Sequence, residues 1–382
     1  MDSIITAVDP PKHDDVTRTV IARPGAPEAS ADDDRAHYLV VVEGDGAGRR
    51  FEVGGENLGV GRTKPADIVV SDALASRNHC RVGLVMGELF VTDLGSSNGT
   101  YVAGKRINKA IVSAGERITI GSTVLEHEWR SKREVMAAQA TDMDLDRAKQ
   151  YVRSLLPAPL ESGPIRTDWV LQPSAKLGGD LFGYHFIDEK TFAIYLLDVT
   201  GHGTGAAMHA VSVMNVLRQR SVPGVDMKDP ARAAAHLNEM FPMERHGGML
   251  LSLWYGVFDL ATRNLAFTSA GHHASYLVDA QRSSSSALDV SNVLIGMIPG
   301  YTYKSESAQV PPGSTLYVFS DGAFEIEPAN GGEWGLDEFL ALLAAPAQPG
   351  KRESRRILET VVARTGRQAF EDDFTLVATA LL

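Results

Sequence analysis

Residues 191–207 read TFAIYLLDVTGHGTGAA, and this stretch decides the fold of the C-terminal half of the chain. An apolar run ends at Asp198, a glycine-rich turn follows, and residues 205–219 continue as GAAMHAVSVMNVLRQ. The pattern predicts a buried strand, a loop and a helix. Removing an unpaired carboxylate from water costs several kcal/mol, so an aspartate that ends a buried strand needs a partner.

Three further aspartate sites border apolar strands. Asp180 follows two glycines and precedes LFGYHFID, Asp321 ends STLYVFSD, and Asp372-Asp373 precedes FTLVATALL. Taken singly, such an aspartate is usually a turn or cap residue. Four sites in this order favour divalent cations instead, because carboxylate oxygens suit Mg²⁺ and Mn²⁺. Neighbouring strands are often joined without an intervening helix, which predicts an α+β layered domain over residues 161–382.

The order of these motifs resembles the SpoIIE/RsbU-type branch of the metal-dependent PP2C serine/threonine phosphatases, over residues 138–382. The matching pieces are LLP at 155–157, GGD at 178–180, DVTGHGTGAA at 198–207, SAGHH at 269–273, SDGAFE at 320–325 and DDFTLV at 372–377. The resemblance implies an αββα sandwich with two Mn²⁺ or Mg²⁺ ions in the cleft between the sheet edges. It also implies the metal ligands, which are the carboxylates of Asp180, Asp198, Asp321 and Asp372 and the backbone carbonyl of Val199, with Asp373 the second choice of its pair.

Two positions depart from the family pattern. Gly183 stands where many members have an acidic residue, and we expect it to tune metal binding rather than abolish it. His273-Ala-Ser stands where many members have two prolines, and we expect it to affect a turn away from the ligands.

The implied mechanism needs no enzyme nucleophile. A water that bridges two metal ions loses much of its pKa of ~16 and attacks phosphorus in line, while the ions neutralise the phosphoryl oxygens. The leaving oxygen still benefits from a proton, and His202 is the candidate donor. A histidine between two glycines also fits a purely loop-structuring role, which is the preferred interpretation.

The N-terminal half has a different pattern of residue types. Over residues 37–130, short β-rich runs alternate with clusters of Gly, Asn, Asp and Ser, which predicts an all-β sandwich. Its turns carry Gly61-Arg62, then SRNH at 76–79, then SSNGT at 96–100. A guanidinium offers a planar fork to a phosphoryl group, a serine hydroxyl adds a neutral donor, and Asn98 suits an extended peptide backbone.

This ordered set resembles the forkhead-associated (FHA) domain, a phosphothreonine-peptide binding module, over residues 37–130. The resemblance implies that His79 shapes the loops and that Arg77 occupies a variable position that tunes affinity. It implies that the residues in contact with phosphate or peptide are Arg62, Ser76, Ser97 and Asn98.

Residues 131–160 predict a linker helix that Pro157 stops. A helical seam is indicated by residues whose separations alternate between three and four positions: Ala138, Thr141, Leu145, Ala148, Val152 and Leu155. This seam either lies on the next domain, which is the preferred interpretation, or pairs with a second chain as a homodimer.

Residues 1–36 carry prolines and the run Asp32-Asp33-Asp34, which predicts a disordered tail. Thr17 and Thr19 lie in this segment, and the disorder predicted for it would give a kinase the accessible, extended chain that it needs. Phosphorylation of either by a cognate Ser/Thr kinase would create an intramolecular ligand for the FHA pocket. The alternative is an inert tail, which is preferred.

Composition excludes several classes of protein. The 37 Lys and Arg against 48 Asp and Glu give a net charge of -11, which argues against binding to the nucleic-acid backbone. The only cysteine, Cys80, excludes an intrachain disulfide and a thiolate zinc site. No apolar run approaches the ~18 residues of a membrane span, and no signal peptide is visible, so we expect a cytoplasmic protein.

The expected protein is therefore multidomain: an all-β FHA sandwich followed by an α+β, PP2C-like αββα sandwich. Its expected function is Mn/Mg-dependent dephosphorylation of phosphoserine or phosphothreonine proteins in bacterial-type signalling, with the FHA module docking phosphothreonine proteins. By family analogy, the substrate is a phosphorylated anti-sigma-factor antagonist of the STAS type. The alternative is a phosphopeptide-binding adaptor with a catalytically silent second domain.

Overall fold

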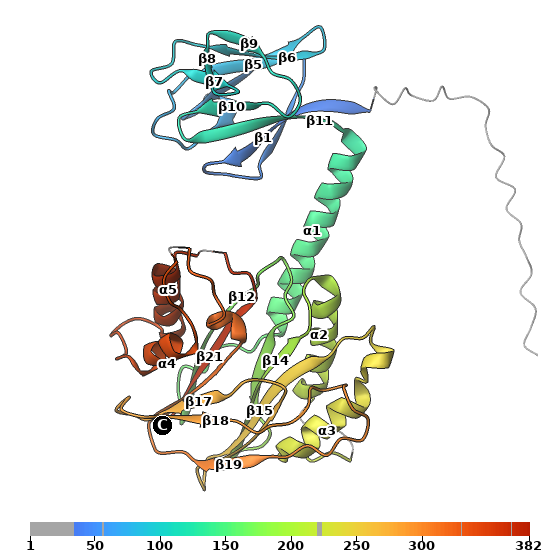
Figure 1. The fold of residues 1–382 in the computed structure, drawn as a ribbon, viewed down its shortest axis with the longest axis vertical. Coiled ribbons are helices and arrows are strands. Elements are labelled where there is room, and N and C mark those ends of the chain that lie inside the picture. The colour runs from blue at the N-terminus through green and yellow to red at the C-terminus, as the bar shows by residue number, and fades with distance from the viewer. Residues whose placement is uncertain (1–33, 56, 220–223, 330, 368) are drawn as a thin grey trace, which may run out of the picture. The chain divides into compact units, whose positions relative to one another are not determined.

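The computed structural model describes residues 34–382 except residues 56, 220–223, 330 and 368 (Figure 1). The chain divides into two compact units, one ending at Ala140 and the other beginning at Thr141. Thr17, Thr19 and most of the predicted tail lie outside the described residues. The first strand starts at Arg35, inside the segment predicted as tail, because Ala36 and Tyr38 are buried against Val135.

The N-terminal unit is a β sandwich. One sheet has the order β2-β1-β11-β10-β7-β8 and the other β4-β3-β5-β6-β9. Leu39, Val60 and Leu125 are fully buried between them. The strands are β1 (Arg35–Glu43), β2 (Arg50–Val53), β3 (Leu58–Gly61), β4 (Ile68–Val69), β5 (Cys80–Val85), β6 (Glu88–Asp93), β7 (Thr100–Val102), β8 (Lys105–Ile107), β9 (Lys109–Ile111), β10 (Arg117–Ile120) and β11 (Thr123–Ser131). The predicted all-β fold is confirmed.

Helix α1 (Lys132–Leu155) follows β11 directly and ends before Pro157. In its first turn, Val135 is buried within the N-terminal unit. At its other end, Leu155 is buried and Val152 packs against the core of the C-terminal unit. Ala138, near the start of the predicted seam, is exposed. Only the C-terminal part of the seam therefore packs against the domain that follows.

The C-terminal unit holds two five-stranded sheets, β12-β21-β20-β17-β18 and β13-β14-β15-β16-β19, and every named strand pair in them is antiparallel. The strands are β12 (Ile165–Gln172), β13 (Leu181–Phe186), β14 (Thr191–Val199), β15 (Leu251–Asp259), β16 (Asn264–Ala270), β17 (Ser275–Val278), β18 (Ser285–Leu288), β19 (Glu306–Gln309), β20 (Ser314–Phe319) and β21 (Phe374–Leu381). The sheets face each other through one apolar cluster, which includes Phe182 and Trp254 from one sheet and Val318 and Val377 from the other.

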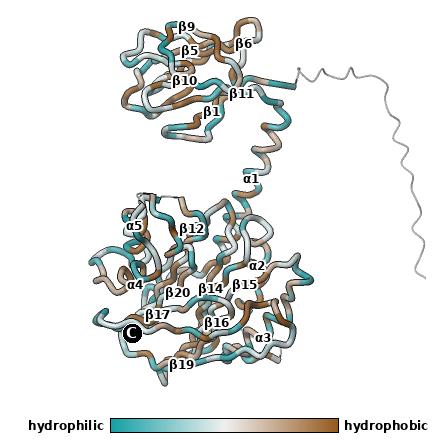
Figure 2. The backbone as a smooth tube through the Cα atoms, viewed as in Figure 1, coloured by the Kyte–Doolittle hydropathy of each residue, from teal (hydrophilic) through white to brown (hydrophobic). Residues whose placement is uncertain are grey.

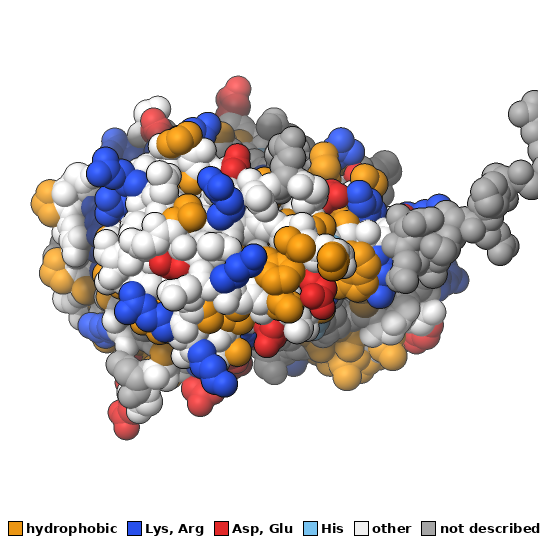
Figure 3. All heavy atoms as spheres, turned by 90° about the horizontal axis from the view of Figure 1, so that it is seen from above, with side chains coloured by type: hydrophobic (Ala, Val, Ile, Leu, Met, Phe, Trp, Pro, Cys, Tyr) orange, Lys and Arg blue, Asp and Glu red, His pale blue; other side chains and the backbone are white. Residues whose placement is uncertain are grey.

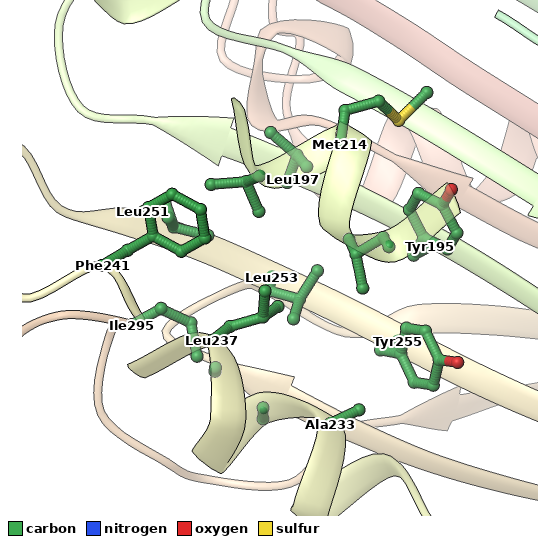
Figure 4. Close-up of a cluster of buried hydrophobic side chains, with 14 of the residues drawn as sticks. Tyr195, Leu197, Met214, Ala233, Leu237, Phe241, Leu251, Leu253, Tyr255 and Ile295 are labelled. Carbon is green, nitrogen blue, oxygen red and sulfur yellow. The ribbon is translucent and has the colours of Figure 1, made fainter. Parts of the chain in front are cut away.

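A helical layer covers each sheet, which completes the predicted αββα sandwich (Figures 1 and 2). Helices α2 (Thr204–Arg218) and α3 (Pro230–Met240) pack on β14 and β15, where Met214 and Leu237 meet Leu197 and Leu253 (Figure 4). Helices α4 (Leu336–Ala344) and α5 (Glu353–Thr365) pack on β20 and β21. Two short 3₁₀ turns, η1 (Met243–Arg245) and η2 (Asp321–Ala323), lie in loops.

Two observations concern the helices and one face of the described part of the chain. None of its helices is both long and apolar enough to cross a bilayer. On the face drawn in Figure 3, Lys and Arg side chains are dispersed among hydrophobic and uncharged ones. That face therefore lacks, among the described residues, the continuous basic patch that marks a binding site for nucleic-acid backbones.

Candidate functional site

The strand ends of both facing sheets bring the predicted aspartates to one cleft. Asp180 directly precedes β13, and Asp198 is the penultimate residue of the neighbouring strand β14. In the other sheet, Asp321 begins η2 just after β20, and Asp372 lies two residues before the neighbouring strand β21. Antiparallel pairing puts the start of one strand beside the end of its neighbour, so each sheet contributes two aspartates at the same edge.

These carboxylates interact strongly with one another. Burial, followed by the negative charges of Asp198 and Asp373, raises the pKa of Asp180 well above its usual value. Burial and then Asp321 raise the pKa of Asp198 to about 7. Partial desolvation also raises the pKa of Asp372, although its side chain reaches solvent, and Asp321 adds to that effect. Among the described residues, none of the five carboxylates pairs with a Lys or Arg.

The donor set fits Mn²⁺ or Mg²⁺ in chemistry and charge, because it consists of hard oxygen atoms around uncompensated negative charge. The Val199 carbonyl lies at the same edge, beside the residue that precedes Asp180. A Cβ atom added to Gly179 would be only 2.7 Å from the Val199 carbonyl oxygen. Within the described ranges, however, no three His, Cys, Asp or Glu side chains are arranged to coordinate one ion.

Neighbouring side chains distinguish the members of the acidic pair. Asp372 is exposed, and its Oδ1 accepts a 2.7 Å hydrogen bond from the backbone N–H of Asp373. Asp373 is buried, and its carboxylate accepts hydrogen bonds from Ser174 and from the backbone N–H of Asp180. Asp372 is thus the member that faces solvent with coordination capacity to spare.

His202 lies at the exposed rim of the same site. It follows β14 in the loop that leads to α2, and its charge acts on Asp372, where it opposes the rise in that carboxylate's pKa. This position brings the predicted proton donor beside the carboxylates. It fits the loop-structuring interpretation equally well.

Sequence reasoning missed the part of the site that contains His273. A cavity of about 140 Å³ adjoins Asp198 and Asp321, and its lining also includes Ser252, His272, His273, Ser320, Phe324 and Glu325. The expectation that the His273 segment affects a turn away from the ligands is therefore wrong. The reason is topological: β16 and β17 belong to different sheets, so the loop between them passes over the cleft. The sequence feature that could have indicated this part of the site is the SAGHH motif at residues 269–273.

The His273 ring is held in a defined orientation. It packs against Phe319 and Phe324, with ring centroids 4.8 and 5.1 Å away. Its Nδ1 lies 2.9 Å from the carbonyl of Ala274, which is the geometry of an Nδ1–H donor, so Nε2 carries the lone pair of the neutral ring. Nε2 is buried and finds no hydrogen-bond partner among the described residues.

Gly183 does not face the carboxylates. It pairs with Tyr195 across β13 and β14, and a side chain at this position would overlap the Tyr195 hydroxyl. Tyr195 belongs to the apolar cluster beneath α2 and α3. Strand alternation points this position toward the helical layer, so any effect of Gly183 on metal binding would be indirect, and the expectation that it tunes metal binding stays a prediction.

The predicted phosphopeptide residues of the N-terminal unit also come together. The backbone N–H of Arg62, after β3, donates to the Ser76 carbonyl at 3.0 Å. The Ser76 hydroxyl accepts from the backbone N–H of Ser97 at 3.1 Å. Asn98 donates through Nδ2 to the Leu74 carbonyl at 2.7 Å, which leaves its side-chain oxygen available as an acceptor.

A buried histidine holds these loops in place. His79 is fully buried, and its Nδ1 accepts from the backbone N–H of Ser76 at 3.0 Å. Its Nε2 then carries the proton and donates to the Gly99 carbonyl at 3.1 Å. Arg62 and Arg77 are both exposed on the same loops. The arrangement presents two guanidinium groups and two serines on a scaffold fixed by His79.

Comparison with known proteins agrees with both geometries. Residues 188–381, just over half of the chain, match the family model described as stage II sporulation protein E (SpoIIE). The chain belongs to the SpoIIE family. Residues 58–121 match the model of the FHA domain. Both resemblances predicted from the sequence are confirmed.

Individual relatives cover one part of the chain or the other. Phosphoserine phosphatase RsbP of Bacillus subtilis is 25% identical over 186 residues, which is 48% of this chain and 46% of RsbP. FHA domain-containing protein FhaB of Mycolicibacterium smegmatis is 39% identical over 92 residues, which is 24% of this chain and 59% of FhaB. This SpoIIE-family chain therefore spans less than two thirds of either relative.

A solved structure shares the fold of the SpoIIE region. The SiaA-PP2C domain of Pseudomonas aeruginosa superposes with a TM-score of 0.56 at 20% identity, covering 64% of this chain and 98% of that domain. The C-terminal unit of this SpoIIE-family chain therefore has the PP2C fold.

Proposed function

We propose that the C-terminal domain is a Mn²⁺- or Mg²⁺-dependent phosphatase of phosphoserine and phosphothreonine proteins. The observation that carries this proposal is the cluster of mutually repelling carboxylates at the edges of both sheets, with no Lys or Arg paired to them among the described residues. Such repulsion destabilises the fold, and divalent cations relieve it. The name of RsbP, a phosphoserine phosphatase, supports the same chemistry.

In this proposal, the residues that hold the ions are Asp180, Asp198, Asp321 and Asp372 through their carboxylates and Val199 through its carbonyl. When bound, two such ions supply an activated water and positive charge beside the phosphoryl oxygens. The Thr375 hydroxyl orients the Asp180 carboxylate. His202, exposed beside Asp372, is the candidate that delivers a proton to the leaving oxygen.

We propose that the FHA domain binds phosphothreonine peptides. Arg62 and the hydroxyls of Ser76 and Ser97 would contact the phosphate, and Arg77 would tune the affinity. The free side-chain oxygen of Asn98 would accept a hydrogen bond from the peptide backbone. The bond between the Ser76 hydroxyl and the Ser97 backbone supports this assignment, because it brings two separate loops to one point.

The partners follow from these two activities. The substrate would be a phosphoserine protein, and by analogy with the SpoIIE family a STAS-type anti-sigma-factor antagonist. A cognate Ser/Thr kinase would create both this substrate and the phosphothreonine ligand of the FHA domain. The protein would act in the cytoplasm, where such kinases have access to it.

The role proposed for α1 is a linker that packs on its own phosphatase domain. The partial burial of Leu145 and Val152 supports this role over pairing with a second chain. Sedimentation of Leu145→Asp and Val152→Asp variants tests it. A drop in mass relative to the wild type would favour the homodimer instead.

The alternative is an adaptor whose second domain is catalytically silent. A silent domain would gain nothing from buried carboxylates whose raised pKa values reflect a cost in folding stability. The test is dephosphorylation of a ³²P-labelled phosphoserine protein by the full chain. We expect label release with Mn²⁺ and none with excess EDTA; no release in either condition would favour the adaptor.

A further inference from the structure

Asp373 lies among the proposed ligands, yet both of its carboxylate oxygens already accept hydrogen bonds. Oδ1 accepts from the backbone N–H of Ser174 at 2.8 Å and from the Ser174 hydroxyl at 2.9 Å. Oδ2 accepts from the backbone N–H of Asp180 at 3.2 Å. The side chain is thus bound to the loop that carries Asp180, although the two residues are 193 positions apart in the sequence.

The main chain of Asp373 holds the other two acidic loops. Its N–H donates to Oδ1 of Asp372 at 2.7 Å. Its carbonyl accepts from the hydroxyl of Ser320, the residue before Asp321, at 2.8 Å. One residue therefore contacts each of the segments that present Asp180, Asp321 and Asp372.

Two glycines allow this close fit. A side chain on Gly178 would overlap the carboxylate of Asp373, and a side chain on Gly322 would overlap its carbonyl. The glycines of the GGD and SDG motifs thus make room for Asp373 and not only for turns. With its carboxylate enclosed in this way, Asp373 is 5% exposed.

We propose that Asp373 is a positioning residue and not a metal ligand. Its carboxylate fixes the loop of Asp180, and its peptide fixes Asp372 and the turn before Asp321, so that those three donors face the cleft together. Coordination of an ion through Oδ1 would require it to release donors of Ser174, and coordination through Oδ2 would compete with the backbone N–H of Asp180 for the same oxygen. The inference rests on the proposed metal site and concerns which residues build it.

The test measures Mn²⁺ binding by isothermal titration calorimetry, with thermal unfolding to verify the fold of each variant. In Asp373→Asn, an NH₂ group replaces one carboxylate oxygen. This NH₂ group faces an N–H donor, so the hydrogen bond at that position is lost. We expect affinity for Mn²⁺ to fall roughly 10–100-fold with unchanged stoichiometry, the usual effect of removing a group that orients metal ligands. Activity should recover as Mn²⁺ is raised. Asp372→Asn, which removes a ligand, should lower the stoichiometry, and excess metal should not restore its activity.

Two further variants make the test decisive. Ser174→Ala removes one donor to Asp373 but no carboxylate, so it should weaken Mn²⁺ binding in the same direction and less than Asp373→Asn does. The double variant should bind no worse than Asp373→Asn alone, because both changes act through one contact. Asp259→Asn is the matched control, since Asp259 accepts from backbone N–H groups in a turn outside the site.

A different pattern would overturn the proposal. If Asp373→Asn loses stoichiometry as Asp372→Asn does, while Ser174→Ala binds Mn²⁺ like the wild type, Asp373 is a ligand. If the wild-type chain binds no Mn²⁺, the metal site itself fails, and this inference fails with it. The wild-type titration thus separates the two failures.

Discussion

The hydroxyl of Thr375 donates a hydrogen bond of 2.7 Å to Oδ2 of Asp180, and this bond joins β21 of one sheet to the residue that precedes β13 of the facing sheet. Thr375 is fully buried and Asp180 is 4% exposed. The bond therefore orients a carboxylate that has little access to water.

Replacing Thr375 by valine keeps the shape of the side chain and removes this donor. We expect Thr375→Val to lower the free energy of unfolding by roughly 1–3 kcal/mol, because a buried acceptor loses its partner. Urea denaturation monitored by fluorescence measures the loss. Thr379→Val on the same strand is the control: the Thr379 hydroxyl is buried and has no partner among the described residues, so its removal should cost no stability. Equal losses in both variants would mean that the bond to Asp180 contributes nothing.

The pKa of Asp198, raised to about 7 by burial and then by Asp321, predicts a pH-dependent stability of the metal-free protein. The folded-state pKa lies above the unfolded value near 4, so the unfolded state ionises first as pH rises. This group should therefore lower stability progressively between about pH 4 and pH 7, by an amount on the order of a few kcal/mol, with no further loss above.

Asp198→Asn removes this titration. In EDTA, we expect the variant to gain stability over the wild type as pH rises through that window. Parallel pH profiles of melting temperature for the two proteins would show that Asp198 ionises in the folded state as it does in water.

His273 should contribute to turnover. The ring lines the cavity beside Asp198 and Asp321, and its buried Nε2 is an acceptor without a partner among the described residues. His273→Phe keeps the packing against Phe319 and Phe324 and removes that acceptor. We expect kcat to fall about tenfold, which corresponds to one hydrogen bond made in the transition state, with little change in the melting temperature. Steady-state kinetics on a small phosphate ester would show unchanged kcat if the ring only fills space.

Arg62 should control peptide binding without affecting catalysis. A guanidinium–phosphate pair is the strongest contact available in the proposed FHA pocket, so Arg62→Ala should abolish binding of a phosphothreonine peptide measured by fluorescence anisotropy. Arg77→Ala should weaken it less. Turnover of a small phosphate ester should stay unchanged in both variants. If Arg62→Ala binds the peptide with wild-type affinity, the phosphate pocket does not include Arg62.

Local sequence patterns were sufficient to predict an all-β domain, an α+β domain and aspartates at strand ends, whereas the αββα arrangement was predicted from the family resemblance. An aspartate such as Asp198 at the end of an apolar run is visible in a few residues, and strand ends in antiparallel sheets meet at edges. The position of His273 was not predictable in this way, because it depends on a loop that crosses between sheets. The orientation of Gly183 toward Tyr195 depends on strand register. The different environments of Asp372 and Asp373 arise from Ser174, which lies 199 positions from Asp373 in the sequence.

The most direct test of the central claim is phosphate release from a phosphoserine protein by the full chain and by Asp198→Asn, each assayed with Mn²⁺ and with excess EDTA. The account predicts turnover only for the wild type with Mn²⁺, and a loss of at least about 100-fold in Asp198→Asn while the fold is retained. Wild-type turnover that persists in excess chelator, or full activity of Asp198→Asn, would contradict it.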